Sequence, residues 1–345
     1  MKGKRKVTAT KWILLCPVMA VAAGYATAQD NGAVERTAAR ERIVAIVRDA
    51  LADGKASNPA DRCWAVVQNA DTGEIVCAEA VGGGTPWNEE RFEIGQLVLP
   101  FLAAGALDAD VVQTNTMLDV SEQTIGDVKI LDFTRGRTEF TLAETIKWSS
   151  QRGGARLALA LGAEGEARTL EAFGLHFDQA DGTEEEQAVR RIRSGFGRDV
   201  TASGLEIASA FSAFANGGRL FRVESADVAV EAVDRPAASP ATCKIVRTML
   251  EGVVGPEGTA RRAAVPGLGV AGKTSTFPIK KGNAYSQDYR AMFAGFFESG
   301  GRAWTILVVF EIPESTRWKD AGVVAAPVFA KIASGILGTS EGEAP

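Results

Sequence analysis

Hydrophobic and polar positions divide the chain into strand-like segments near both ends and helical segments between them. Asp71-Thr72-Gly73 is a turn signal between two mostly apolar runs, which predicts a hairpin. Apolar residues recur at helical spacing over 35–52 and over 325–337. Five segments have the apolar or β-branched composition of strands: 64–69, 74–80, 270–276, 289–297 and 303–310.

The order of these segments predicts the fold class. From about Gly95 to Gly255 the pattern is mostly helical, with glycine-rich breaks. Strands that lie at both ends of a chain can share one sheet only if the helices between them form an inserted lobe. We therefore expect an α/β (α+β) protein with one antiparallel sheet, flanking helices and a helical lobe. A site is expected in the cleft between sheet and lobe.

The N-terminus has the pattern of a secretory signal peptide. An apolar stretch over 12–23 is followed by Ala26-Thr27-Ala28, which places small residues where a signal peptidase cleaves. An uncleaved membrane anchor is the alternative, although the stretch is short for a span and contains Pro17. The basic residues before it are Lys2, Lys4, Arg5, Lys6 and Lys11.

Four segments follow from this pattern: a signal peptide at 1–28, an N-terminal helix and lead-in at 29–60, the main domain at 61–338, and a disordered tail at 339–345. We expect an exported protein of the periplasm or cell envelope. It would contact a membrane only through an uncleaved N-terminus.

We predict cleavage after Ala28 because the small residues follow the apolar stretch at the usual place. Protein recovered from its native host should begin at Gln29 when its N-terminus is sequenced. Full-length protein in the membrane fraction would show that the segment is an anchor.

Composition excludes several classes of function. The net charge is -5, and acidic and basic residues are interspersed, whereas a nucleic-acid-binding protein needs a clustered basic face. His176 is the only histidine, so we expect it to be structural and expect no metal site. No cofactor is expected. Cys63 and Cys77 flank the predicted hairpin and either pair or, like Cys243, remain buried thiols.

One motif matches a nucleotide-binding loop but lacks its context. Residues 267–274 fit the pattern G-x-x-x-x-G-K-[ST]. A phosphate-binding loop must be followed by a helix whose N-terminus faces the phosphates. The next residues are Ser275, Thr276, Phe277 and Pro278, which favour a strand. We therefore reject nucleotide hydrolysis and expect no helix to start at Lys273.

Several blocks in a fixed order resemble one protein family. The hairpin is followed by Phe92-Glu-Ile-Gly95, Ser194-Gly-Phe-Gly197, Ala215-Asn-Gly-Gly218, Gly258-Thr-Ala260 before Ala271-Gly-Lys-Thr274, and Ala325-Ala-Pro-Val-Phe329. In these blocks the chain resembles, from Trp64 to Leu337, the transpeptidase domain of class B, division-type penicillin-binding proteins. The resemblance implies the penicillin-binding-protein transpeptidase fold and a role in peptidoglycan synthesis.

The residues that carry this family's chemistry are replaced. The family uses S-x-x-K, S-x-N and K-T-G motifs, in which the lysine of the first motif activates its serine. Here Gln96 stands at the nucleophile position and Leu99 at the lysine position. The second motif is Ser149-Ser150-Gln151, and the third is Lys273-Thr274-Ser275. Gln96 offers no attacking oxygen, and Leu99 cannot accept a proton.

These departures predict a pseudoenzyme that acts as a binding or scaffolding module. The expected binding residues are Ser149, Gln151, Lys273, Thr274 and Ser275. The expected partners are a peptidoglycan stem peptide, a β-lactam bound reversibly, or proteins of cell-wall synthesis. The alternative is an acyl hydrolase or transpeptidase with a relocated nucleophile, because Ser149 and Lys273 match family residues that face each other across the cleft.

Overall fold

The computed structural model describes residues 17–122, 124–125, 128–130, 132, 136–177, 182–226, 231–233, 235–282 and 284–341. The chain divides into two compact units, Met1–Arg42 and Ile43–Pro345. In the first unit the described residues form the beginning of helix α1 (Pro17–Ser57). The basic residues of the expected signal peptide lie outside the described residues. Helix α1 includes the helix expected at 35–52 but begins earlier, before the expected cleavage site.

The central sheet of the second unit has five antiparallel strands, as the sequence predicts. Their order across the sheet is β12 (Ala271–Lys281), β13 (Ala284–Ser299), β14 (Arg302–Ile312), β1 (Arg62–Asn69) and β2 (Ile75–Val81). Strands from the two ends of the chain meet where Val66 of β1 pairs with Leu307 of β14. The sheet leaves β12 as an edge strand, which borders the helical lobe.

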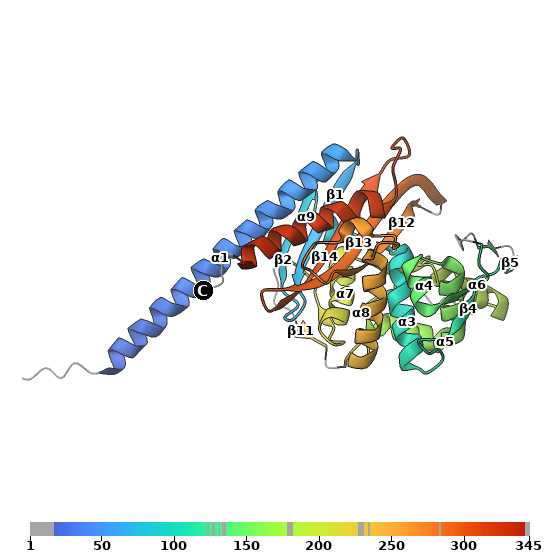
Figure 1. The fold of residues 1–345 in the computed structure, drawn as a ribbon, viewed down its shortest axis with the longest axis horizontal. Coiled ribbons are helices and arrows are strands. Elements are labelled where there is room, and N and C mark those ends of the chain that lie inside the picture. Colours follow the sequence, from blue (N-terminus) through green and yellow to red (C-terminus); the bar gives the residue numbers. More distant parts are fainter. Residues whose placement is uncertain are drawn as a thin grey trace, which may run out of the picture. The chain divides into compact units, whose positions relative to one another are not determined.

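Helices cover both faces of this sheet. On one face, α9 (Ala321–Glu341) packs against β13 and β14, and Phe329 meets Phe293 edge-on with ring centroids 4.8 Å apart. Helices α7 (Gly204–Ala215) and α8 (Pro240–Val254) pack against the other face (Figure 1). Residues 321–339 of α9 are long and apolar enough to cross a membrane, but 56% of that stretch is buried inside the protein. Helix α9 therefore serves as a core helix of the sheet.

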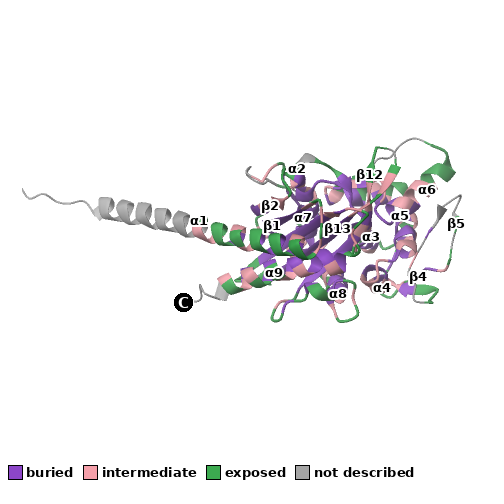
Figure 2. Ribbon diagram, turned by 90° about the horizontal axis from the view of Figure 1, so that it is seen from above, coloured by how far each residue is buried: buried purple, intermediate pink, exposed green. Residues whose placement is uncertain are grey.

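The helical lobe has a core of aromatic side chains. Phe101 lies within 5.5 Å, between ring centroids, of Phe173, Phe211 and Phe214. Figure 2 shows this buried layer continuing from the lobe into the sheet. The lobe helices are α3 (Leu99–Asp108), α4 (Leu142–Lys147), α5 (Gln151–Ala172) and α6 (Glu184–Ser194).

Serine and threonine residues fix where several helices begin. The Thr141, Thr183 and Ser203 hydroxyls each accept a hydrogen bond from the backbone three residues later, and a glutamate returns the bond. Such capping boxes satisfy amide groups that a helix start leaves unpaired. They mark the starts of α4, α6 and α7.

Short ladders in the lobe did not follow from the sequence pattern. The most important joins β3 (Phe92–Glu93), β9 (Val200–Ala202) and β8 (His176–Phe177). Strands of two or three residues are too short to show alternation. The other short elements are α2 (Pro86–Glu89), η1 (Gly95–Val98), β4 (Met117–Asp119), β5 (Thr124–Ile125), β6 (Val128–Lys129), β7 (Glu139–Thr141), β10 (Phe221–Arg222), β11 (Glu231–Ala232) and η2 (Arg261–Ala263).

Three expectations need correction or completion. Residues 339–341 of the expected disordered tail belong to α9, and the rest of the tail lies outside the described residues. Cys63 and Cys77 are buried thiols that are not joined in a disulfide, and Cys243 is likewise a buried thiol. In the strand register Cys77 faces Val67, four residues from Cys63, which is about 13 Å along a strand and too far for a disulfide. His176 lies on β8 and is exposed.

Candidate functional site

Lys273 lies on an edge strand and not on a phosphate-binding loop. Residues 271–281 form β12, and no helix begins at Lys273, which confirms the rejection of the nucleotide-binding motif. Pro278 continues this strand because an edge position does not require its missing N–H, and the register shifts just after it. Strand β12 therefore presents Lys273-Thr274-Ser275 along the side of the helical lobe.

Ser149 lies in the three-residue link between α4 and α5. The Ser150 hydroxyl caps α5 by accepting a hydrogen bond from the Gly153 amide at 3.0 Å, and it donates to Asp132 Oδ2 at 2.5 Å. Ser149 is thus the serine that is left to face the sheet. Its φ of 58° lies in the left-handed region, which a non-glycine residue adopts only when its surroundings hold it there.

The structure brings Ser149 and Lys273 together. The Lys273 ammonium donates to Ser149 Oγ at 2.5 Å and to the Thr274 carbonyl at 2.9 Å. Lys273 is 0% exposed, and burial lowers its pKa to about 7, an effect that the charge of Asp320 partly opposes. A serine hydroxyl next to a lysine that is partly neutral at neutral pH has the elements of a nucleophile and its base.

Gln96 and Ser275, which both replace family residues in the resemblance above, contact each other. Ser275 Oγ donates to Gln96 Oε1 at 3.2 Å, so one hydrogen bond joins η1 to β12. Ser275 is 1% exposed, and its hydroxyl lies 2.3 Å from where a Cβ on Gly95 would be. Gly95 also has a φ of 54°, a backbone conformation that side chains disfavour. The close Ser275 hydroxyl and this conformation both require glycine at position 95. These residues occupy the space between η1 and β12.

Leu99 is a core residue of α3. It is 0% exposed, and its Cδ2 lies 2.6 Å from where a Cβ on Gly154 would be. Gly154 of α5 also approaches the Gly195 carbonyl so closely that a Cβ would lie 1.9 Å from it. At this position the chain has an apolar contact between helices and no group that can take a proton.

Thr274 and Gln151 complete the predicted set. The Thr274 hydroxyl lies 2.9 Å from that of Thr259, which donates to the Lys147 carbonyl at 3.4 Å. Gln151, which is half-buried, begins α5 two residues after Ser149. Sequence reasoning did not assign Thr259 to the site, although it lies in the Gly258-Thr-Ala260 block. The position of Thr259 in this sequence block does not indicate that its hydroxyl contacts the hydroxyl of Thr274.

The buried Lys273 predicts a pH-dependent stability. Its folded pKa is about 7, below the ordinary lysine pKa of 10.5, so the unfolded chain binds more protons between these values and stability increases with pH there. Below about pH 7 the full cost of burying the charge applies. Lys273→Met should therefore raise the melting temperature by several degrees at pH 6, and the gain should shrink by pH 9.5.

The exposed Lys280 on the same strand gives the matched control. Lys280→Met should change the melting temperature little at either pH, as measured by scanning calorimetry. An equal gain for Lys273→Met at pH 6 and pH 9.5 would show that Lys273 titrates normally.

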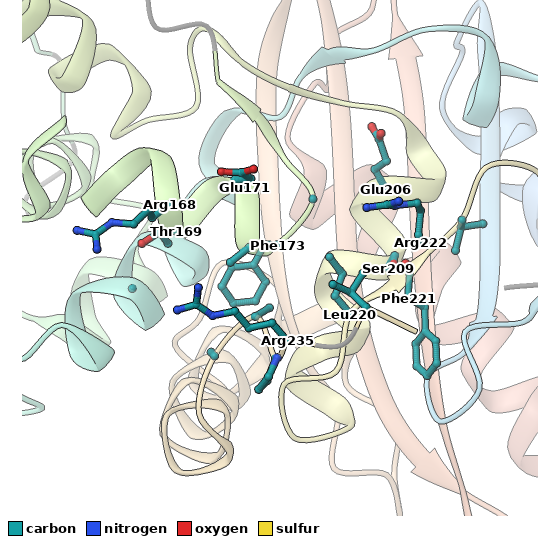
Figure 3. Close-up of a pocket in the computed structure, with 18 of the residues that line it drawn as sticks. Arg168, Thr169, Glu171, Phe173, Glu206, Ser209, Leu220, Phe221, Arg222 and Arg235 are labelled. Atoms are coloured by element: carbon teal, nitrogen blue, oxygen red, sulfur yellow. Dashed lines mark hydrogen bonds between the residues drawn. The ribbon is translucent and has the colours of Figure 1, made fainter. Parts of the chain in front are cut away.

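One hollow lies away from Ser149 and Lys273. It has a volume of about 1360 Å³ and lies at the C-terminal ends of α3 and α5, whereas the candidate site lies at their N-terminal ends. Figure 3 shows Phe173 and Leu220 in its lining, with Arg168 and Arg235 beside them. Its buried Ser209 hydroxyl is already paired with the Phe221 carbonyl. Among the described residues, no group of three or more His, Cys, Asp or Glu is placed to hold a metal ion.

Comparison with known families gives a match over most of the chain. The family model of the penicillin-binding protein transpeptidase domain matches residues 64–334. In solved structures, the transpeptidase domain of Burkholderia pseudomallei penicillin-binding protein 3 superposes with a TM-score of 0.74 at 26% identity, covering 87% of this chain and 94% of that one. A Burkholderia ambifaria peptidoglycan glycosyltransferase structure, at 24% identity and a TM-score of 0.71, covers 88% and 96% and shares the fold.

Curated relatives show the same similarity. The peptidoglycan D,D-transpeptidase FtsI of Escherichia coli K12 is 28% identical over 87% of this chain and 55% of its own length. A probable peptidoglycan D,D-transpeptidase, PbpC of Pseudomonas aeruginosa, is 28% identical over 72% of this chain and 46% of its own length. The chain thus spans about half the length of these curated relatives.

Proposed function

Because the chain belongs to the penicillin-binding protein transpeptidase family, which takes part in peptidoglycan synthesis, we propose that it is a degenerate member that binds cell-wall peptide without acylating itself. The observation that carries this proposal is the Gln96–Ser275 hydrogen bond. Two residues that depart from the family motifs meet where the family places its nucleophile and its glycine-bearing strand.

The absence of a base at Leu99 supports the same conclusion. An acyl-transfer serine needs a group that takes its proton as it attacks. Leu99 is fully buried against Gly154 and has no polar atom. Gln96 is a primary amide, which is a poor nucleophile. The positions that match S-x-x-K therefore serve packing and hydrogen bonding.

What remains can hold a peptide. Edge strand β12 pairs with another strand, β13, on one side only, and peptide-binding domains often add an extended chain along such an edge. The half-buried Ser149 and Gln151 lie on the lobe side of that strand. Lys273 contributes less charge than the sequence alone suggested, because it is buried and its pKa is about 7.

The Ser149–Lys273 contact favours a second candidate, an acyl hydrolase with a relocated nucleophile. The 2.5 Å distance and the lowered lysine pKa are what a Ser-Lys pair requires. In this candidate, neutral Lys273 accepts the Ser149 proton while Ser149 Oγ bonds to the acyl carbon. The leaving group departs with the proton that Lys273 returns, and water then hydrolyses the acyl-enzyme. Labelling of the protein by a serine-reactive probe separates this candidate from the first.

A binding titration tests the first candidate. A peptidoglycan stem pentapeptide should bind the wild-type protein reversibly in calorimetry. Gln96→Ala should tighten binding by roughly fivefold, since a net hydrogen bond of about 1 kcal/mol between Gln96 and Ser275 no longer opposes entry. The exposed Gln113 supplies the matched control, Gln113→Ala, which should leave affinity unchanged. If neither wild type nor Gln96→Ala binds the peptide, this cleft is not a peptide site.

The cellular setting of this proposal is the periplasm or cell envelope. The signal-like N-terminus and the family's role in peptidoglycan synthesis both favour that location. Cell-wall synthesis proteins are the protein partners that fit it, and a β-lactam would bind only reversibly.

A further inference from the structure

A buried carboxyl group joins helices α5 and α6 of the lobe. Glu166 of α5 is 0% exposed, and its Oε1 is in hydrogen-bond contact with the hydroxyl of Ser194, the last residue of α6. In the part of the chain that the structure describes, Glu166 Oε2 has no hydrogen-bond partner. Because a buried carboxylate without full pairing is costly, this contact should depend on whether Glu166 carries a charge.

The Ser194 hydroxyl indicates which form of Glu166 this arrangement needs. Its oxygen contacts two other oxygens, Glu166 Oε1 and the Arg191 carbonyl oxygen, the latter at 2.8 Å. A hydroxyl has one hydrogen, and a peptide carbonyl supplies none. Each contact has its own hydrogen only if Ser194 donates to the Arg191 carbonyl while Glu166 donates to Ser194. Glu166 must then be protonated.

The surroundings of Glu166 favour the protonated form at neutral pH. Burial raises the pKa of Glu166 to about 8, an effect that the Ser194 hydrogen bond and the charge of Arg191 partly oppose. The ordinary pKa of a glutamate is 4.5, so Glu166 should keep its proton at neutral pH and lose it in mildly alkaline solution.

Other charged side chains on α5 and on the elements packed against it are exposed or engaged elsewhere. The ion pairs are Arg193–Asp199, Arg156–Asp119, Arg137–Glu144 and Lys147–Glu257. Asp108 of α3 accepts hydrogen bonds from Ser239 and Thr242, Arg152 donates to the Val120 and Ile130 carbonyls, and Arg190 interacts with Glu186. The exposed residues are Glu164, Arg168, Glu171, His176, Glu184 and Glu185. Within the described residues, Arg191 is therefore the charged group that faces Glu166 from another element.

Ser194 begins a turn, 194–197, that makes two close backbone contacts near the candidate site. A Cβ on Gly154 of α5 would lie 1.9 Å from the Gly195 carbonyl oxygen. At the other end of the turn, the Gly197 carbonyl accepts a hydrogen bond from the Gly95 amide at 3.3 Å. Closely packed segments transmit small shifts, and Gly95 directly precedes Gln96. A displacement of Ser194 should therefore reach the backbone that positions Gln96.

We propose that protonated Glu166 is an alkali-sensitive latch that holds the 194–197 turn against α5 and against the backbone before Gln96. Loss of the proton leaves Ser194 with one hydrogen for two acceptors, so one of its two hydrogen bonds is lost. It also leaves a buried carboxylate whose attraction to Arg191 does not offset the cost of burial. The latch is a property of the folded lobe, so this proposal does not rest on peptide binding by the cleft.

An NMR titration of the full chain tests the latch directly. Glutamate is labelled with carbon-13 at the side-chain carboxyl, and the resonance that is absent in Glu166→Gln identifies Glu166. Its titration midpoint in the wild type should lie near pH 8, far above the ordinary 4.5. The amide nitrogen resonances of Gly95 and Gly197 should shift with that same midpoint in the wild type and should show no such step in Glu166→Gln. A Glu166 midpoint near 4.5, or glycine resonances that do not follow Glu166, would overturn the proposal.

Thermal unfolding gives a second readout. Between pH 4.5 and about 8 the folded protein keeps the Glu166 proton and the unfolded chain has lost it, so the contribution of Glu166 to stability falls as pH rises. The amide of Glu166→Gln can donate to Ser194 as the protonated acid does, and it does not ionise. Glu166→Gln should therefore melt close to the wild-type temperature at pH 5 and several degrees above it at pH 9.

The exposed Glu164, two residues earlier on α5, gives the matched control. Glu164→Gln should differ little from the wild type in melting temperature at either pH. Both variants keep Lys273, so the titration of that lysine cancels in each comparison with the wild type. The same difference between Glu166→Gln and the wild type at pH 5 and at pH 9 would show that Glu166 is not a titrating latch.

Discussion

Gly197→Ala should destabilise the protein by about 2–5 kcal/mol, with a melting temperature lower by many degrees. Two costs add at this residue. Gly197 has a φ of 80°, which a side chain disfavours by about 1–2 kcal/mol. A Cβ there would also lie 1.9 Å from the Gly95 carbonyl oxygen, and backbone cannot move aside as a side chain can. Because Gly95 directly precedes Gln96, the substitution should also disturb the Gln96–Ser275 hydrogen bond.

Gly217 provides the matched control. It has the same φ of 80°, but a Cβ there would meet nothing within 4 Å. Gly217→Ala should therefore cost only the backbone term of about 1–2 kcal/mol. Scanning calorimetry of the two variants isolates the close approach between Gly197 and Gly95. Equal losses of stability in Gly197→Ala and Gly217→Ala would show that the Gly197 and Gly95 backbones are not in close contact. In that case η1 is not held against Gly197.

The central sheet and the position of Lys273 were predictable because they depend on long apolar segments. Strands such as β13 and β14 are long enough for composition to specify them, and one sheet is the arrangement that buries their apolar faces. Proline at 278 ruled out a helix after Lys273, which decided between a strand and a phosphate-binding loop. The hairpin formed by β12 and β13 extends past the predicted strands because its polar end carries no apolar signal.

The contacts that define the site were less predictable. The sequence placed Gln96 and Ser275 at altered positions, but only the fold shows that the two side chains meet. It also could not show that Ser150 caps α5 and leaves Ser149 to face Lys273, because adjacent serines have equal capping ability.

A penicillin should not acylate the wild-type protein. Acylation requires an attacking oxygen, a base and donors for the oxyanion, and these act as one unit. Loss of a nucleophile in such a unit lowers the rate by on the order of a millionfold. Gln96 and Leu99 supply neither oxygen nor base at the matched positions, and the Gln96–Ser275 hydrogen bond occupies the space beside β12.

Ser149 is the residue through which this prediction can fail. Its hydroxyl already receives a hydrogen bond from Lys273, whose pKa is lowered to about 7 by burial. Ser149→Ala removes the hydroxyl, while Ser150→Ala removes the α5 cap and the hydrogen bond to Asp132 but keeps Ser149, and so tests for nonspecific effects. A serine-active penicillin-binding protein treated in parallel shows that the reagent is reactive.

Intact-mass spectrometry after prolonged incubation with a penicillin tests the central claim most directly. Wild type, Ser149→Ala and Ser150→Ala should all keep their unmodified masses while the serine-active control gains one penicillin. A stable penicillin adduct on wild type that persists in Ser150→Ala and disappears in Ser149→Ala would contradict the claim. In that case the protein is an enzyme with Ser149 as its nucleophile.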